Sequence, residues 1–194
     1  MRSTTTSADE LARAANVLGA LSLALVDRVH GAVADVGVAG ETSAAALSAL
    51  HHFLDAPTIG RLRDVVGRTS PATVRMVDRL VADGYARRRP GEDARASHVE
   101  LTPAGRNLAR RVSAARAAVL EEALGALAPT ERATFTGLLG RVLEAMVEAK
   151  LERRAGEREP SGWTCRICDP GACRRDHGDC PAANAARRVT TLAL

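Results

Sequence analysis

Apolar residues recur every three or four positions along most of this sequence, which places them on one face of an α-helix. The pattern persists for unusually long distances in three stretches, residues 7–36, 103–127 and 130–152. A chain of 194 residues has too small a core to cover three apolar helix faces of that length. We therefore expect a mainly helical protein in which a second copy of the chain covers these faces, forming a homodimer.

The first of these stretches must also be tested as a membrane or secretion signal. Its longest apolar run, from Val17 to Val26, is interrupted by Ser22 and is about half as long as a membrane span. The residues before this run include Asp9 and Glu10, whereas a signal peptide begins with a basic segment. The sequence therefore predicts an N-terminal helix of a cytoplasmic protein that has no contact with a membrane.

Between residues 41 and 102 the predicted elements are shorter. Helices are expected to begin at Thr42 or Ser43, at Thr58 and at Ser70, because hydroxyl side chains cap helix N-termini. Gly67 is expected to end the helix that begins at Thr58. Residues 85–89 and 96–101 flank a Pro-Gly turn and predict one β-hairpin. The predicted fold class is therefore mainly α with a small β-wing, in which a winged helix-turn-helix is joined to long dimerisation helices.

The predicted helix over residues 70–83 has two distinct faces. At about 100° per residue, one face can pack inward and contains Thr73, Met76, Val77 and Leu80. The opposite face carries Pro71, Arg75, Asp78 and Arg79. An arginine in the middle of an exposed helix face can donate hydrogen bonds to O6 and N7 of guanine in the DNA major groove. The pattern predicts a DNA-recognition helix, although an ordinary amphipathic surface helix has the same two faces.

The predicted hairpin is rich in arginine. Arg88 lies in its first strand between two further arginines, and Arg95 follows the turn. An arginine at the tip of such a wing can enter the narrow minor groove, and Asp93 can hold Arg95 in place by a charge-assisted hydrogen bond. A solvated turn is the alternative interpretation. The candidate DNA-contacting residues are Arg68, Thr69, Ser70, Arg75, Arg79, Arg88, Asp93 and Arg95.

The stretch from Thr58 to Arg111 resembles the MarR family of bacterial transcription regulators. The resemblance rests on residues 73–80 and on the runs Asp83-Gly84-Tyr85, Glu92-Asp93-Ala94-Arg95 and Leu101-Thr102-Pro103-Ala104-Gly105. Ala94 departs from the family pattern, because many members carry a second arginine there. The resemblance implies a homodimer built from the first helix and the two long C-terminal helices. It also implies a recognition helix in the major groove and a wing in the adjacent minor groove.

All four cysteines of the chain lie close together near its C-terminus. Cys165, Cys168, Cys173 and Cys180 have the spacing C-x2-C-x4-C-x6-C, and cytoplasmic thiols seldom form stable disulfides. Four thiolates on tight turns can surround a zinc ion, which would supply the folding energy that so short a segment lacks. An iron–sulfur cluster, which also takes four thiolates, is the alternative cofactor. His177 in place of one cysteine, and a disordered tail, are further alternatives.

These patterns divide the chain into four parts. Residues 1–40 are predicted to form an N-terminal dimerisation helix, and residues 41–102 a winged helix-turn-helix DNA-binding domain. Residues 103–154 are predicted to form the C-terminal dimerisation helices. Residues 155–194 are predicted to form a linker and a cysteine-rich metal-binding tail.

The predicted function is a dimeric, sequence-specific regulator of transcription, a repressor that responds to a small molecule, a metal or a redox signal. Its expected partners are a pseudo-palindromic duplex operator, a second copy of the chain and an unknown effector. Aromatic residues make up only 2% of the chain, which argues against a stacking platform for single-stranded nucleic acid. Hydrolase, ATPase and metalloprotease motifs are absent, so the sequence does not predict an enzyme. The alternative function is a dimeric interaction module whose cysteine knuckle docks a partner protein.

Overall fold

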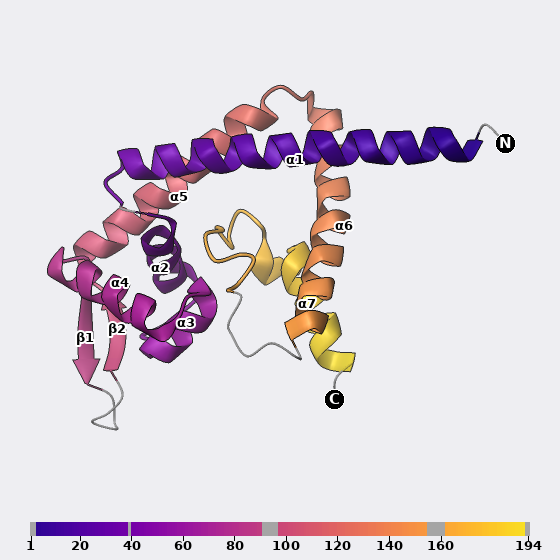
Figure 1. Cartoon of the computed structure of the whole chain (residues 1–194). Coiled ribbons are helices and arrows are strands. Elements are labelled where there is room, and N and C mark those ends of the chain that lie inside the picture. The colour runs from indigo at the N-terminus through magenta and orange to yellow at the C-terminus, as the bar shows by residue number, and fades with distance from the viewer. Residues whose placement is uncertain (1–2, 39, 91–96, 155–161, 193–194) are drawn as a thin grey trace.

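The computed structural model describes residues 3–38, 40–90, 97–154 and 162–192 of the chain. The described residues are mostly helical and form one two-stranded antiparallel sheet, which confirms the predicted fold class (Figure 1). In chain order the elements are α1 (Ser3–Asp35), α2 (Glu41–His52), α3 (Ile59–Val66), α4 (Ser70–Ala82), β1 (Ala86–Pro90), β2 (Ser97–Leu101), α5 (Pro103–Leu124), α6 (Pro129–Arg154), the short 3-10 helix η1 (Arg175–His177) and α7 (Pro181–Leu192).

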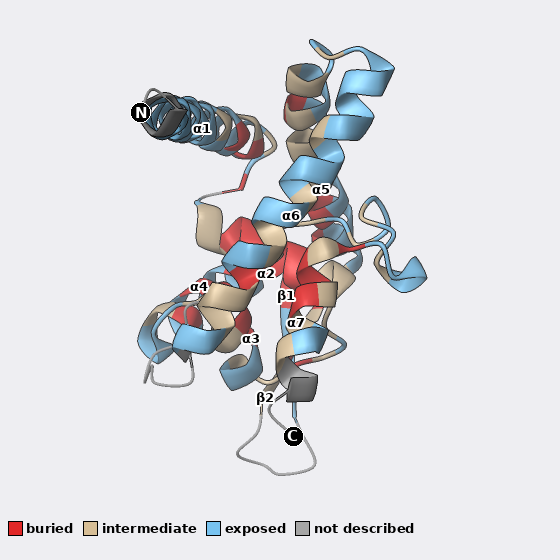
Figure 2. Ribbon diagram, turned by 90° about the vertical axis from the view of Figure 1, so that its right-hand side faces the viewer, coloured by how far each residue is buried: buried red, intermediate tan, exposed pale blue. Residues whose placement is uncertain are grey.

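Helix α2 lies at the centre of the winged-helix unit, where most of the buried residues gather (Figure 2). It begins at Glu41, so the predicted start at Thr42 or Ser43 is wrong by one or two residues. The residue at the N-cap is Gly40, whose positive φ of 85° suits glycine, and no side chain caps the helix there. The Thr42 hydroxyl instead accepts a hydrogen bond of 3.0 Å from Nε of Arg68, in the turn after α3.

Helices α3 and α4 form the helix-turn-helix, and the predicted ends of α3 are confirmed. The Thr58 hydroxyl caps its N-terminus by accepting a hydrogen bond of 3.2 Å from the amide of Arg61. Gly67 ends the helix in the left-handed conformation, with φ of 67°, and its amide donates to the carbonyl of Arg63. The side chains of Leu62, Val65 and Val77 are fully buried between the helices of this unit.

The wing joins the helix-turn-helix to the long helix α5. Strands β1 and β2 pair in the register Ala86↔Leu101 to Pro90↔Ser97. At the end of β2, Thr102 accepts a hydrogen bond from the amide of Gly105 and donates one to the carbonyl of Gly84. A β-carbon built on Gly105 would lie 1.9 Å from the carbonyl oxygen of Tyr85. The junction between wing and α5 therefore requires glycine at position 105.

Helix α1 is only partly covered by the rest of the chain. Val29 and Val33 near its C-terminal end are buried where α1 packs against α5, whereas its N-terminal half extends beyond the other elements (Figure 1). By length and composition, the segment Ser7–Asp35 is a helix that could cross a membrane, and only 11% of its most apolar window is buried. This segment is longer than the run Val17–Val26 considered above, because the helix continues on both sides of it.

The C-terminal part of the chain packs on two different surfaces. Helix α7, which was not predicted, lies along α6 and buries Val147 of α6 with Ala182 and Ala185 of α7. Arg188 adds ion pairs of 3.1 Å to Glu144 and 2.9 Å to Glu148. Residues Trp163 and Ile167, which lie before α7, pack instead against the core of the winged-helix unit.

We expect Gly105→Ala to lower the free energy of unfolding by about 2–4 kcal/mol, because the added methyl group meets a backbone carbonyl that cannot move aside. Gly137→Ala is the matched control, since Gly137 also lies inside a helix but has open space around its would-be β-carbon. The control variant should gain roughly 0.5–1 kcal/mol from reduced backbone entropy. Urea unfolding followed by circular dichroism measures both changes, and equal stabilities would contradict the close approach.

Candidate nucleic-acid interface and cysteine cluster

Helix α4 has the two faces that its sequence predicts. Thr73, Met76, Val77 and Leu80 are buried, and the hydroxyl of Thr73 donates to the carbonyl of Thr69. Arg75 and Arg79 are exposed on the opposite face. Neither guanidinium group has a hydrogen-bond or ion-pair partner among the described residues. Both groups are therefore available to an external acceptor.

The three described arginines of β1 form hydrogen bonds with acidic side chains. Arg88 reaches back to α4 and donates to Asp78 at 2.8 Å. Arg87 and Arg89 both donate to the carboxylate of Glu100 on β2, at 3.0 Å and 2.6 Å. The hydrogen bond from Arg89 is the largest cause of the lowered pKa of Glu100.

These two acidic partners were missed by sequence reasoning. For Glu100 the signal was present, because it faces Arg87 in the hairpin register. For Asp78 there was no comparable local signal, because its partner lies on a different element. The predicted contacts Asp93 and Arg95 lie outside the described residues.

The turn between α3 and α4 carries the remaining predicted residues. Arg68 bonds to Thr42 of α2, and Ser70 accepts a weak hydrogen bond of 3.4 Å from Arg63. Thr69 is the N-cap residue of α4, but its hydroxyl makes no capping hydrogen bond. The exposed start of α4 thus brings Thr69, Ser70 and Arg68 together, and a helix N-terminus of this kind favours a phosphate group.

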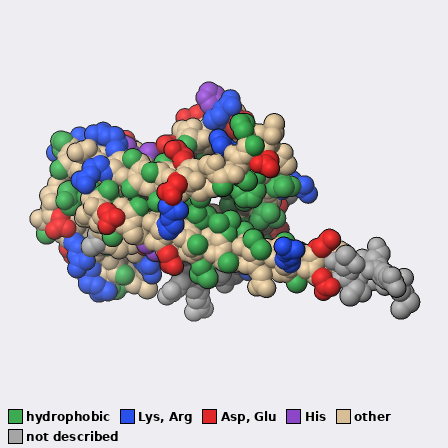
Figure 3. All heavy atoms as spheres, turned by 90° about the horizontal axis from the view of Figure 1, so that it is seen from above, with side chains coloured by type: hydrophobic (Ala, Val, Ile, Leu, Met, Phe, Trp, Pro, Cys, Tyr) green, Lys and Arg blue, Asp and Glu red, His purple; other side chains and the backbone are tan. Residues whose placement is uncertain are grey.

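A large exposed apolar surface lies away from this face. Hydrophobic side chains gather along α1 and on the surface beside it when the molecule is seen from above (Figure 3). The exposed large apolar residues of α1 and α6 are Leu11, Val17, Leu18, Leu21, Leu23, Val26, Leu138, Leu139, Val142 and Met146. Such a surface on a single chain indicates an interaction site.

The four cysteines lie near one another. Cys165 and Cys173 pack against the cluster that contains Cys180, which directly precedes α7, and the thiol of Cys165 interacts with that of Cys168. The hydrogen bond from Cys165 and the positive charge of Arg116 lower the pKa of Cys168 to about 6, and the Arg116 guanidinium lies 3.9 Å from its sulfur. The same thiol pairing, together with burial, raises the pKa of Cys165 far above its ordinary value. Burial is the main cause of the raised pKa of Cys173.

This donor set suits zinc in its chemistry, because thiolates are preferred ligands of that ion. As placed, however, the described residues do not gather three or more His, Cys, Asp or Glu side chains around a point where an ion could sit. His177 is exposed at the end of η1. The zinc site and its iron–sulfur alternative therefore stay predictions.

Residues 162–180, which contain the four cysteines and are called the cysteine segment below, contact the helix-turn-helix directly. The amide of Trp163 donates to the carbonyl of Val65 in α3 at 2.8 Å, and the Arg61 guanidinium lies 5.1 Å from the centroid of the Trp163 ring. Arg166 forms an ion pair of 2.6 Å with Glu41, the first residue of α2, and that hydrogen bond lowers the pKa of Glu41. Sequence reasoning missed this pair because its members are 125 positions apart and no local pattern connects them.

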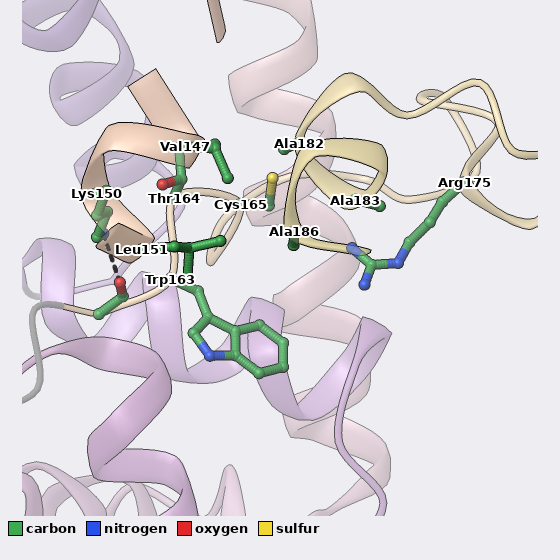
Figure 4. A pocket seen from close by; sticks show the side chains of 11 residues that line it. Val147, Lys150, Leu151, Trp163, Thr164, Cys165, Arg175, Ala182, Ala183 and Ala186 are labelled. Carbon is green, nitrogen blue, oxygen red and sulfur yellow. Dashed lines mark hydrogen bonds between the residues drawn. The ribbon is translucent and has the colours of Figure 1, made fainter. Parts of the chain in front are cut away.

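A cavity of about 200 Å³ lies where α6 and α7 meet the start of the cysteine segment (Figure 4). Its walls are mainly apolar and include Val147 and Leu151 of α6, with Arg175 reaching its edge. The side chain of Lys150 donates to the carbonyl of Gly162 at 2.6 Å beside it. The cavity is smaller than the pockets of about 300–1,000 Å³ that usually hold drug-sized ligands.

Part of this chain matches the model of one protein family. Residues 37–96 match the family model described as "MarR family", a span that contains α2, α3, α4 and β1. No curated protein matches the chain.

Solved structures share the fold. A protein from Mycobacterium tuberculosis, RV1404, is 28% identical with a TM-score of 0.55, and the match covers 77% of this chain and 95% of that one. Wild-type MarR from Escherichia coli in its apo form is 22% identical, with a TM-score of 0.57 and coverage of 66% and 96%. A mutant of MepR from Staphylococcus aureus, solved bound to an oligodeoxyribonucleotide, is 16% identical, with a TM-score of 0.54 and coverage of 68% and 96%. The family match ends before the cysteine cluster, so that cluster is additional to the matched domain.

Proposed function

Because residues 37–96 of this chain match the MarR family model, we propose that the protein is a dimeric repressor of transcription that binds a pseudo-palindromic duplex operator. The observation that carries the proposal is the exposed face of α4, where Arg75 and Arg79 have no partner among the described residues. A recognition helix with free guanidinium groups next to an arginine-rich wing suits duplex DNA. The oligonucleotide in the MepR structure supports the same use of this fold.

The dimer is proposed from the continuity of one apolar stripe. Val29 and Val33 of α1 are buried against α5, and the same helix face continues toward the N-terminus through Leu18 and Leu11, which are 47% and 72% exposed. The apolar stripe of α1 is therefore covered by α5 at its C-terminal end and exposed at its N-terminal end. A second chain that supplies helices of the same kind would cover it and place two recognition helices on one duplex.

Repression and its release follow from this arrangement. A cytoplasmic dimer on its operator would exclude RNA polymerase, and an effector would act by favouring a different spacing of the two recognition helices. The effector belongs to one of three classes, a small molecule, a metal or a redox signal.

The first test is binding to random-sequence duplex DNA at several salt concentrations. The logarithm of the association constant should fall linearly with the logarithm of salt concentration, by about 0.9 for each phosphate contacted. Fluorescence anisotropy of a labelled duplex measures this slope. A protein that binds no duplex at low salt would contradict the regulator and favour the interaction module instead.

Arg75→Ala should cost roughly 1–3 kcal/mol of binding free energy on a duplex selected from a random library, and should relax base preference at one position of each half-site. Arg132→Ala is the matched control, because it removes the same charge at the start of α6, far from the wing (Figure 1). Its affinity should be unchanged on every duplex. A uniform loss for Arg75→Ala across all sequences would show that Arg75 contacts phosphate and reads no base.

Leu18→Glu should convert the dimer to a monomer, because it places a charge on the uncovered stripe of α1. Asn16→Glu is the control, since Asn16 is exposed on nearly the opposite side of the same helix. Sedimentation equilibrium of the two variants and the native protein measures the change. A native protein that is monomeric, or that partitions onto lipid vesicles through α1, would overturn the proposed dimer surface.

A further inference from the structure

At Gly162 the backbone of the cysteine segment touches the backbone of the helix-turn-helix. Gly162 is buried and has a positive φ of 72°. A β-carbon built there would lie 3.1 Å from the amide nitrogen and Cα of Gly67 and 3.2 Å from the carbonyl oxygen of Val65. Gly67 ends α3 immediately before the turn to α4. The segment therefore rests on the turn that sets the position of the recognition helix.

Four side-chain contacts lie around this point. The ring of Trp163 lies against Arg61 of α3 and, with ring centroids 6.1 Å apart, edge-on to Phe53 after α2. Arg166 pairs with Glu41 at the start of α2, and Arg116 of α5 reaches the sulfur of Cys168. The turn that bears Cys165 and Cys168 thus connects α2, α3 and α5.

We propose that the four cysteines bind one zinc ion, and that the zinc-loaded segment holds the turn between α3 and α4 in its DNA-binding position. The proposal deepens the function given above and rests on it for the effect on DNA binding. Zinc is chosen from the chemistry of the ligands. Four thiolates can bind zinc tetrahedrally, whereas cations such as Mg²⁺ and Ca²⁺ prefer oxygen ligands.

The need for a metal follows from how little else orders this segment. Between Gly162 and Cys180 its regular structure is limited to the three-residue helix η1. Its larger apolar residues, Trp163 and Ile167, pack on the winged-helix core, whereas Cys165 and Cys173 pack against α6 and α7, so residues 162–180 are attached to two surfaces and have no apolar core of their own. A metal cross-link between the turns would supply the missing order.

Binding requires a small closure of the segment. The four cysteines lie in one region, with Cys165 and Cys173 packed against the cluster of Cys180, but no three ligands among the described residues surround a common centre. A zinc ion with sulfur distances of about 2.3 Å would draw the four thiols together. Four thiolates around one Zn²⁺ carry net negative charge, and the guanidinium of Arg116 beside Cys168 would offset part of it.

The first experiment tests the metal. Protein stripped of metal and kept reduced should take up one Co²⁺ or Zn²⁺ per chain, and the cobalt form should show the visible bands of tetrahedral sulfur coordination. Cys168→Ser should weaken uptake and alter those bands, whereas His177→Ala, in the same segment but outside the ligand set, should leave both unchanged. No uptake, an iron–sulfur absorption spectrum in the anaerobically purified protein, or a stable disulfide in its place would overturn the zinc site.

The second experiment tests the contact with the helix-turn-helix. Trp163 is the single tryptophan of the chain, so its fluorescence reports where the cysteine segment lies. Removing zinc should shift its emission to the red and increase quenching by acrylamide, and adding zinc should reverse both changes. Gly162→Val should bind zinc normally but keep Trp163 exposed, because the added side chain meets the backbone of Gly67.

The third experiment tests whether zinc in the cysteine segment changes the affinity for DNA. Zinc-loaded native protein should bind a selected duplex roughly 5–150-fold more tightly than the zinc-free protein, with zinc-loaded Gly162→Val resembling the zinc-free protein. Equal affinities of these three forms would overturn the holding role. If no form binds duplex DNA, the proposed function fails, while metal uptake and Trp163 fluorescence still decide whether zinc docks the segment.

Discussion

The close packing around α2 is the constraint on which the remaining structure depends. All of residues 43–50 are buried, and this stretch contains four alanines and two serines beside Leu47 and Leu50. Small side chains let α5 approach one side of the helix while α3, α4 and β2 pack on others. A larger residue on any of these sides would separate α5 from the helix-turn-helix. The fold therefore uses a narrow central helix to connect its two functional parts.

Sequence periodicity predicted the elements whose ends and faces are decided locally. The buried face of α4, the Thr58 cap and the Gly67 stop of α3 each depend on neighbours within a few residues. The start of α2 could not be predicted in this way, because the hydroxyl of Thr42 binds Arg68 from a different turn. The position of the cysteine segment is decided by contacts such as Arg166–Glu41, which join residues far apart in the sequence. DNA contact by the predicted residues stays a prediction, since it involves atoms outside the chain.

The arginines that the sequence places on the wing are already paired with acidic residues in the structure. The sequence places three consecutive arginines on β1, yet Glu100 pairs with two of them and Asp78 with the third. Exposed ion pairs of this kind add little stability, so their main consequence is orientation. Arg88 fixes β1 against α4, and the pairing with Glu100 joins the two strands. Arg75 and Arg79 of α4, in contrast, have no partner among the described residues, which makes that helix the more available source of positive charge for DNA.

The helix-turn-helix is held from two sides by contacts of different kinds. On one side, α2 and α5 connect it to the long helices through an apolar core that changes little without unfolding. On the other side, the cysteine segment reaches it through the hydrogen bond from Trp163 to Val65, the contact of the Trp163 ring with Arg61 and the close approach of Gly162 to Gly67. A few such contacts can be broken at much lower free-energy cost than a packed core. Arg116 lies on α5 and Glu41 begins α2, so a shift of the segment would also act on these two helices. The weaker side is therefore where the proposed binding of zinc would act on α4 while the fold stays intact.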